Sequence, residues 1–114
     1  MSQELEDRFE SFARSVRDFC QKLKWDAINL KYIRQLIKAS ASVAANYVEA
    51  SDDIGKADEK MKIRISRREA KGCAVFLRLV LLYGNKILEF ERAKIRQETV
   101  QIRNILSTIL KKLG

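Results

Sequence analysis

The sequence of 114 residues contains no histidine, no proline, two cysteines and four glycines. Without histidine, the chain lacks the commonest general base and the commonest nitrogen ligand for metals. A chain this poor in proline and glycine cannot supply the many tight turns that an all-β sandwich or barrel needs. Cys20 and Cys73 are too few and too isolated for a disulfide framework, which is typical of proteins kept in a reducing cytosol.

Long hydrophobic runs are also missing. No stretch reaches about 18 uncharged apolar residues, the length that would predict a transmembrane helix. The first residues, Met1 to Asp7, are acidic and contain no apolar stretch, so they do not have the pattern of a signal peptide. Apolar residues make up 46% of the chain and are spread along it, which argues against disorder. We therefore expect a small, cytoplasmic, all-α protein with no membrane partner.

Positive charge is concentrated in the second half of the chain. Lys and Arg number 23 against 15 Asp and Glu, a formal net charge of +8. Residues 1–55 are close to neutral, with 8 basic and 9 acidic residues, whereas residues 56–88 carry 9 basic and 3 acidic residues. An excess of this size bears on partners and solubility rather than on the fold, and its usual partners are nucleic acid, an anionic membrane surface or an acidic protein face.

Apolar residues recur at steps of three and four in four successive segments, which is the period of an amphipathic helix. The segments run from about 3 to 23, 30 to 50, 56 to 83 and 89 to 113. Asp26 or Asn29 could cap the second helix, and Gly84 could end the third. Four helices with short connectors predict one domain over residues 1–114, an antiparallel up-and-down four-helix bundle.

The third segment is apolar on two roughly opposite faces. The first face carries Met61, Ile65, Gly72, Phe76, Leu79 and Tyr83. The second face carries Ile63, Ala70, Ala74, Leu77 and Leu81. A helix that is apolar on both sides must bury both. We interpret the second face as the interface of a homo-oligomer, so that Leu77→Glu would lower the solution mass and leave the helices folded.

Between these faces runs a stripe of basic residues at helical spacing. Its members are Lys60, Arg64, Arg67, Lys71 and Arg78. We interpret the stripe as a surface that binds the phosphates of RNA or DNA, assisted by Lys62, Arg68 and the basic residues of the last segment. Because no aromatic residue interrupts it, we expect recognition of the backbone rather than of sequence. The alternative is a solvated face on a structural or adaptor protein that binds another protein.

Three polar residues lie beside the apolar faces. Asn46 and Glu49 of the second segment are interpreted as a structural link to the third segment, with Arg67, Arg68 or Lys71 as the partner. Glu69 is assigned a structural role as well. A buried polar group without such a partner would cost roughly 1–3 kcal/mol.

Catalysis is not indicated. Glu49 and Glu69 are carboxylates without a nucleophile or an anion hole, and four-helix metal sites use Glu-x-x-His motifs that this chain cannot form. Cys20 and Cys73 are expected to be small core residues. We predict no catalytic residue, no metal site and no cofactor, and hence a protein that is not an enzyme.

Two stretches of the chain resemble a known family. Residues 33–50, IRQLIKASASVAANYVEA, look like the second helix of bacterial four-helix bundle proteins first noted in intervening sequences of large-subunit ribosomal RNA genes. Residues 63–71, IRISRREAK, followed by Phe76-Leu77-Arg78-Leu79, are similar to that family's third helix. The resemblance extends over nearly the whole chain and is strongest from Tyr32 to Val80.

The resemblance implies a four-helix bundle that assembles as a barrel-like homopentamer. One related branch is the accessory protein of diversity-generating retroelements, a basic pentamer that binds nucleic acid and the reverse transcriptase. For this chain the resemblance therefore implies nucleic acid and a reverse transcriptase as partners. The chain departs from the family at Gly72 and Ala74, where acidic or large residues are common.

Overall fold

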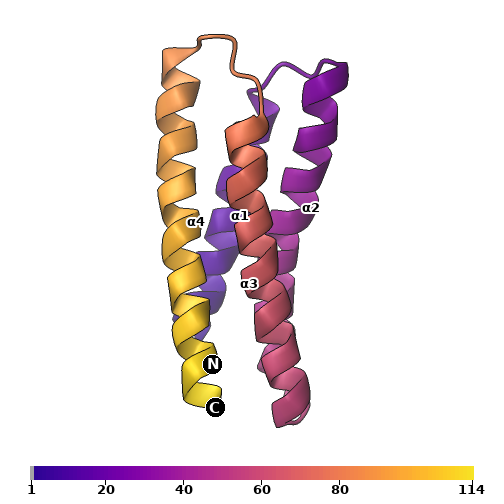
Figure 1. The fold of residues 1–114 in the computed structure, drawn as a ribbon, viewed down its shortest axis with the longest axis vertical. Helices are drawn as coiled ribbons and strands as arrows, with labels where there is room; N and C mark the ends of the chain where they lie inside the picture. Colours follow the sequence, from indigo (N-terminus) through magenta and orange to yellow (C-terminus); the bar gives the residue numbers. More distant parts are fainter. Residues whose placement is uncertain (1) are drawn as a thin grey trace.

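A computed structural model describes residues 2–114, and these residues form four α-helices and no strand (Figure 1). The helices are α1 (Gln3–Gln21), α2 (Ala27–Ala50), α3 (Lys56–Leu79) and α4 (Lys86–Leu113). Successive helices run antiparallel, so the two chain ends lie together at one end of the molecule (Figure 1). Each helix packs against its two neighbours in the order α1, α2, α3, α4, which confirms the all-α fold with four packed helices. Within residues 2–114 no helix has an apolar stretch sufficient to cross a bilayer.

Side-chain caps place the starts of α2 and α4 three residues earlier than the periodicity indicates. The Asp26 carboxylate accepts hydrogen bonds from the backbone N–H groups of Ile28 and Asn29, so α2 begins at Ala27. The Asn85 side chain accepts from the N–H of Leu88, so α4 begins at Lys86. Each cap satisfies donors that a helix start leaves without an intrahelical partner.

The third helix ends at Leu79 rather than at Tyr83. Val80 turns out of the helix into an extended conformation with ψ of 143°. Tyr83 and Gly84 then both adopt positive φ angles, 53° and 75°. The chain therefore reverses direction at Tyr83 and Gly84 together and not at glycine alone. Tyr83 adopts a positive φ although the left-handed region is unfavourable for a bulky side chain.

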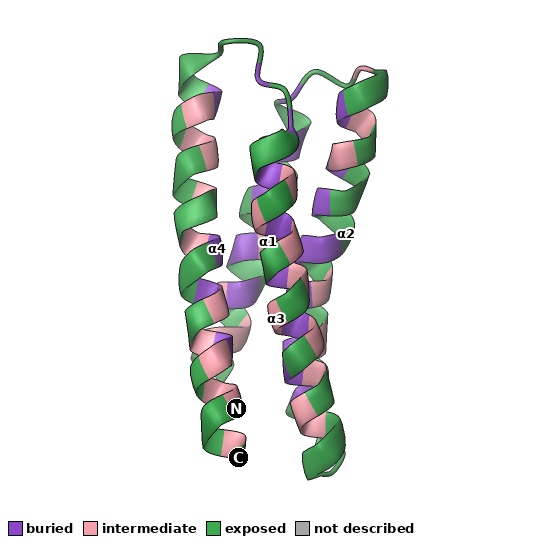
Figure 2. Ribbon diagram, viewed as in Figure 1, coloured by how far each residue is buried: buried purple, intermediate pink, exposed green. Residues whose placement is uncertain are grey.

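A single buried cluster fills the centre of the bundle, and Figure 2 shows its buried segments facing inward along each helix. From α1 and α2 it takes large side chains, including Phe9 and Tyr47, whose rings meet edge to face with centroids 4.8 Å apart. From α3 it takes mostly small or medium side chains: Ile63, Ser66, Ala70, Cys73 and Leu77. Alternating steps of three and four keep these five on one line, as in a coiled-coil seam.

This arrangement corrects the interface expected from the sequence. Ile63, Ala70 and Leu77 are each 0% exposed inside the protomer, so they cannot form a contact between subunits. Ala74 is half-buried beside α4, and Leu81 lies beyond the end of α3. Assigning this face to an interface left the face with the larger side chains as the expected core face. Instead, α3 packs against both α2 and α4 with its smaller residues. One of them, Ser66, donates a hydrogen bond to the carbonyl of Val43 at 2.8 Å.

The bulkier apolar face of α3 is the one left at the surface. Met61 is 48% exposed and Leu79 45% exposed, while Ile65 and Phe76 are half-buried. Phe76 packs beside Tyr32 of α2, with ring centroids 6.5 Å apart. Helix α3 therefore does have an apolar face outside the core. That face is the one with Met61, Phe76 and Leu79, and not the one interpreted from the sequence as the interface.

A buried asparagine fastens one end of the bundle. The amide of Asn29, 0% exposed, donates to the carbonyls of Lys24 and Leu81 and accepts from the Leu81 N–H, at 3.0, 2.9 and 2.8 Å. One side chain thus joins the α1–α2 connector to the α3–α4 connector. Arg92 adds to this end by donating to the carbonyl of Val80 at 3.2 Å.

Asn29→Ala should lower the free energy of unfolding by about 2–4 kcal/mol, because three backbone groups lose their hydrogen-bond partner together. Asn46→Ala is the matched control, since Asn46 makes one hydrogen bond, to the Ser42 carbonyl within its own helix. We expect a change below about 1 kcal/mol for that control. Urea denaturation followed by circular dichroism measures both, and equal effects would contradict the fastening role of Asn29.

Leu77→Glu should unfold the protein, because it places a carboxylate without a partner in the core. Ala74→Glu should remain helical, since Ala74 lies half-buried at the edge of the bundle. Circular dichroism and light scattering of the two variants separate the possibilities. A helical Leu77→Glu protein of reduced mass would restore the interface that the sequence had suggested.

Candidate nucleic-acid interface

The basic stripe of α3 forms one wall of a groove, and α4 forms the other. Near the chain ends, Lys60, Arg64 and Arg67 face Ser107 and Lys111 of α4. In the middle of the helix, Arg64, Arg67, Arg68 and Lys71 face Arg103. Near the connector, Arg78 and Ala74 face Lys94, Arg96 and Arg103. We refer to these three consecutive hollows as the α3/α4 groove.

The side chains that line the α3/α4 groove carry charge of one sign only, and at the chain end Lys60 donates a hydrogen bond to the main-chain oxygen of Gly114 at 2.5 Å. Its ten basic residues are Lys60, Arg64, Arg67, Arg68, Lys71, Arg78, Lys94, Arg96, Arg103 and Lys111. No aspartate or glutamate lines it, and none of the ten belongs to an ion pair formed within residues 2–114. Charges brought together in this way raise the local positive potential well above that of isolated surface lysines.

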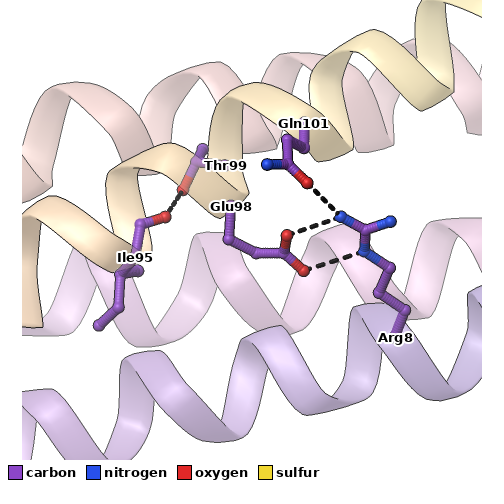
Figure 3. A network of polar contacts seen from close by, with 5 residues as sticks. All are labelled: Arg8, Ile95, Glu98, Thr99 and Gln101. Carbon is purple, nitrogen blue, oxygen red and sulfur yellow. Dashed lines mark hydrogen bonds and ion pairs between the residues drawn. The ribbon is translucent and has the colours of Figure 1, made fainter.

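The groove on the other side of α4 has equal numbers of basic and acidic side chains in its lining. It is lined by the basic residues Arg8, Lys22 and Lys94 and by the acidic residues Asp18, Glu91 and Glu98. Figure 3 shows Arg8 of α1 reaching Glu98 and Gln101 of α4. Arg8 donates two hydrogen bonds to the Glu98 carboxylate, at 2.7 and 3.0 Å, and one to Gln101 at 2.8 Å. This pairing raises the pKa of the Arg8 guanidinium above its ordinary value.

The two sides of α4 therefore differ because its acidic residues lie toward α1. Glu91 forms an ion pair with Lys22 at 3.0 Å, and Glu98 forms one with Arg8. The remaining acid, Glu89, lies 3.8 Å from Lys86 in its own first turn. With all three carboxylates of α4 engaged in these contacts, the basic residues that turn toward α3 have no acidic neighbour in the groove.

Hydroxyl and amide groups lie among the basic side chains at the chain-end part of the groove. Asn104, Ser107 and Thr108 line it there, and Arg67 donates to the Ser107 hydroxyl at 3.4 Å. Such groups and guanidinium donors are the ones that proteins use to bind phosphate oxygens. The arrangement can hold a polyanion along its length.

Two of the three polar residues singled out from the sequence take structural contacts. Glu49 accepts an ion pair from Lys62 of α3 at 3.0 Å, so the link between the second and third helices exists with a different basic partner. Lys62 consequently lies on the α2 side of α3, away from the groove that it was expected to assist. Asn46 does not make the predicted link to α3, since its hydrogen bond within residues 2–114 goes to the Ser42 carbonyl of its own helix. Glu69 is half-buried on α3.

The cysteines are core residues, as expected. Both are free and 0% exposed. Burial raises the pKa of the Cys20 thiol to about 11 and that of Cys73 to about 12, so neither is a thiolate near neutral pH. Residues 2–114 bring together no group of three or more histidine, cysteine, aspartate or glutamate residues that could hold a metal ion.

One feature of the groove was not found from the sequence. Phe90, 68% exposed, lines the groove beside Arg78 and Lys94. It stands seven residues before Gln97, which lines the same hollow, so helical spacing within α4 could have indicated it. That Phe90 lies across from Arg78 depends on how α3 and α4 pair, which periodicity does not give.

No family model, no curated protein and no solved structure matches the chain.

Proposed function

We propose that this protein is a non-enzymatic, oligomeric nucleic-acid-binding protein of the cytoplasm, and that the α3/α4 groove is its binding surface. The observation that carries the proposal is the contrast between two grooves on either side of one helix. Ten basic residues and no acidic residue line the groove toward α3, whereas three basic and three acidic residues line the groove toward α1, with Lys94 bordering both. A charge excess serving solubility alone would not require this separation.

The shape of the groove supports a linear polyanion rather than a compact one. From Phe90 to Lys111 the groove follows α4 for about 32 Å, at 1.5 Å per residue. A nucleic acid strand presents phosphates continuously over such a length, and each neutralised phosphate releases counterions. Arginine, which supplies six of the ten basic residues, suits planar and bidentate contacts with phosphate oxygens.

The proposed oligomer would use the exposed apolar face of α3 together with α2. On this face Tyr32 of α2 packs beside Phe76 of α3, and Leu79 of α3 is 45% exposed. Burying such side chains between subunits stabilises an assembly by roughly 25 cal/mol per Å² of apolar surface. The family resemblance adds a pentamer as the expected subunit number, and a reverse transcriptase as the machine to which the protein is accessory.

We propose binding of another protein, through the same exposed apolar face, as the alternative function. Because Met61 and Leu79 are each more than 40% exposed, the face could bind another protein instead of a second copy. In that case the protein is a structural or adaptor protein, and the basic groove serves solubility. Binding to nucleic acid distinguishes the two functions.

Neutralising the centre of the stripe should weaken nucleic-acid binding at every sequence. The variant combines Arg64→Gln, Arg67→Gln and Lys71→Gln. Wild-type affinity for labelled RNA should fall by orders of magnitude between about 50 and about 200 mM salt, and the variant should lose roughly two to three units of that salt slope. Fluorescence anisotropy titrations at several salt concentrations measure both quantities.

The matched control removes the same net charge from another face. It combines Lys31→Gln, Arg34→Gln and Lys38→Gln, all on the exposed side of α2. We expect this control to retain affinity and slope to within a factor of a few. Equal losses in both variants would contradict the groove as the binding surface, and the absence of binding at about 50 mM salt would leave the adaptor function.

Leu79→Glu should lower the solution mass toward that of one protomer and leave helicity unchanged, because it puts a charge on the exposed face of α3. Ile37→Glu is the control, since Ile37 is 40% exposed but lines the groove between α1 and α2. Light scattering measures the masses. A wild-type protein with the mass of one protomer would reject the oligomer outright.

A further inference from the structure

The connector end of the α3/α4 groove differs in chemistry from the rest. Phe90 and Val100 are exposed there, 68% and 47%, and Ala74 and Ala93 line the same hollow. Its cationic side chains, referred to below as its basic rim, are Arg78, Lys94, Arg96 and Arg103. This hollow therefore combines apolar and cationic side chains, whereas the chain-end part of the groove carries Asn104, Ser107 and Thr108.

The ring of Phe90 is positioned to accept a flat partner. Lys94, one turn further along α4, places its Nζ 5.7 Å from the ring centroid, over one face of the ring. Phe90 is not among the partly buried residues that pack against the core. At 68% exposure, most of the Phe90 side chain remains open to solvent although Lys94 lies over the ring. An aromatic ring beside cationic side chains is the combination with which proteins hold unpaired bases.

We infer that the α3/α4 groove takes a single-stranded nucleic acid, one base of which stacks on Phe90 while its phosphates contact the basic rim. This inference rests on the proposed function and specifies its ligand. In a duplex both faces of each internal base are covered by neighbouring bases, so a duplex offers the groove phosphates alone. A single strand offers phosphates to the basic residues and a free base face to Phe90, and therefore matches both parts of the lining.

The ring changes the expected recognition in one respect. Contact with the strand is not confined to its backbone, because stacking adds a contact to a base. Such a contact tolerates every base, since all four have a π-face. The groove is accordingly selective for strandedness and not for sequence.

The test compares one labelled RNA strand of about 15 nucleotides with the same strand annealed to its complement; even when stacked, at about 3.4 Å per nucleotide, it exceeds the length of the groove. Wild-type protein should bind the single strand more tightly than the duplex. Phe90→Ala should weaken binding of the single strand by roughly 5- to 150-fold, the range that corresponds to losing one stacked base. Its affinity for the duplex and its salt slope should not change, because no phosphate contact is lost.

Three further variants separate stacking from other effects. Phe90→Trp keeps an aromatic face and should restore single-strand affinity, whereas Phe90→Leu keeps an apolar side chain without one and should not. Ile87→Ala removes another exposed apolar residue of the same helix, 72% exposed and outside the groove lining, and should bind as the wild type does. Circular dichroism should show equal helicity for all four proteins.

Each remaining outcome rejects a distinct statement. If single strand and duplex bind equally and Phe90→Ala has no effect, the groove is a phosphate surface only: the inference fails and the proposed function stands. If Phe90→Leu binds like the wild type, the contact is apolar and not stacking, which also overturns the inference. If neither nucleic acid binds at about 50 mM salt, the proposed function fails and the inference fails with it.

Discussion

Helix α3 lies between α2 and α4 because the side chains on its core-facing line are small enough to let both neighbours approach. Ser66, Ala70 and Cys73 occupy the middle of that line, and each is 0% exposed. Once this line faces inward, the orientation of the helix leaves its basic stripe beside α4 and its bulky apolar residues beside α2. The charged groove and the exposed apolar face are thus two consequences of one packing constraint, since rotating α3 to bury either would expose the seam.

Electrostatics then acts on the arrangement that packing has set. The carboxylates of Glu91 and Glu98 are held toward α1 by Lys22 and Arg8, at distances of 3.0 and 2.7 Å. Partly exposed pairs of this kind add little to stability. Their effect on the surface is larger, because they hold two of the three carboxylates of α4 on the side away from the α3/α4 groove. At physiological ionic strength a potential decays over about 8 Å, so acids lying on the far side of α4 compensate it weakly.

The sequence predicts the fold well because amphipathic periodicity is strong in all four helices, and the α3 wall of the groove follows from the spacing of Lys60, Arg64, Arg67 and Lys71. The boundaries of α2 and α4 depend on side-chain caps at Asp26 and Asn85, which shift each start by one turn. The core face of α3 was assigned wrongly: Ile63, Ala70 and Leu77 were interpreted as a subunit interface, whereas they lie in the core on one line with Ser66 and Cys73, because the space between helices selects small residues. The α4 wall, with Arg103 and Phe90, requires knowing which helix lies beside α3.

The hydrogen bonds of Asn29 hold one end of the bundle more firmly than the other. At one end Asn29 joins the connectors of residues 22–26 and 80–85, and Arg92 holds the end of α3. At the other end the connector between α2 and α3 is exposed throughout, from Ser51 to Gly55. Local opening starts where protected backbone bonds are fewest, so the exposed connector of residues 51–55 should open before the end that Asn29 holds. Phe90 lies at the end of the bundle that Asn29 holds, and Lys60 lies at the other end. The groove should therefore change its width at the Lys60 end while its Phe90 end stays fixed.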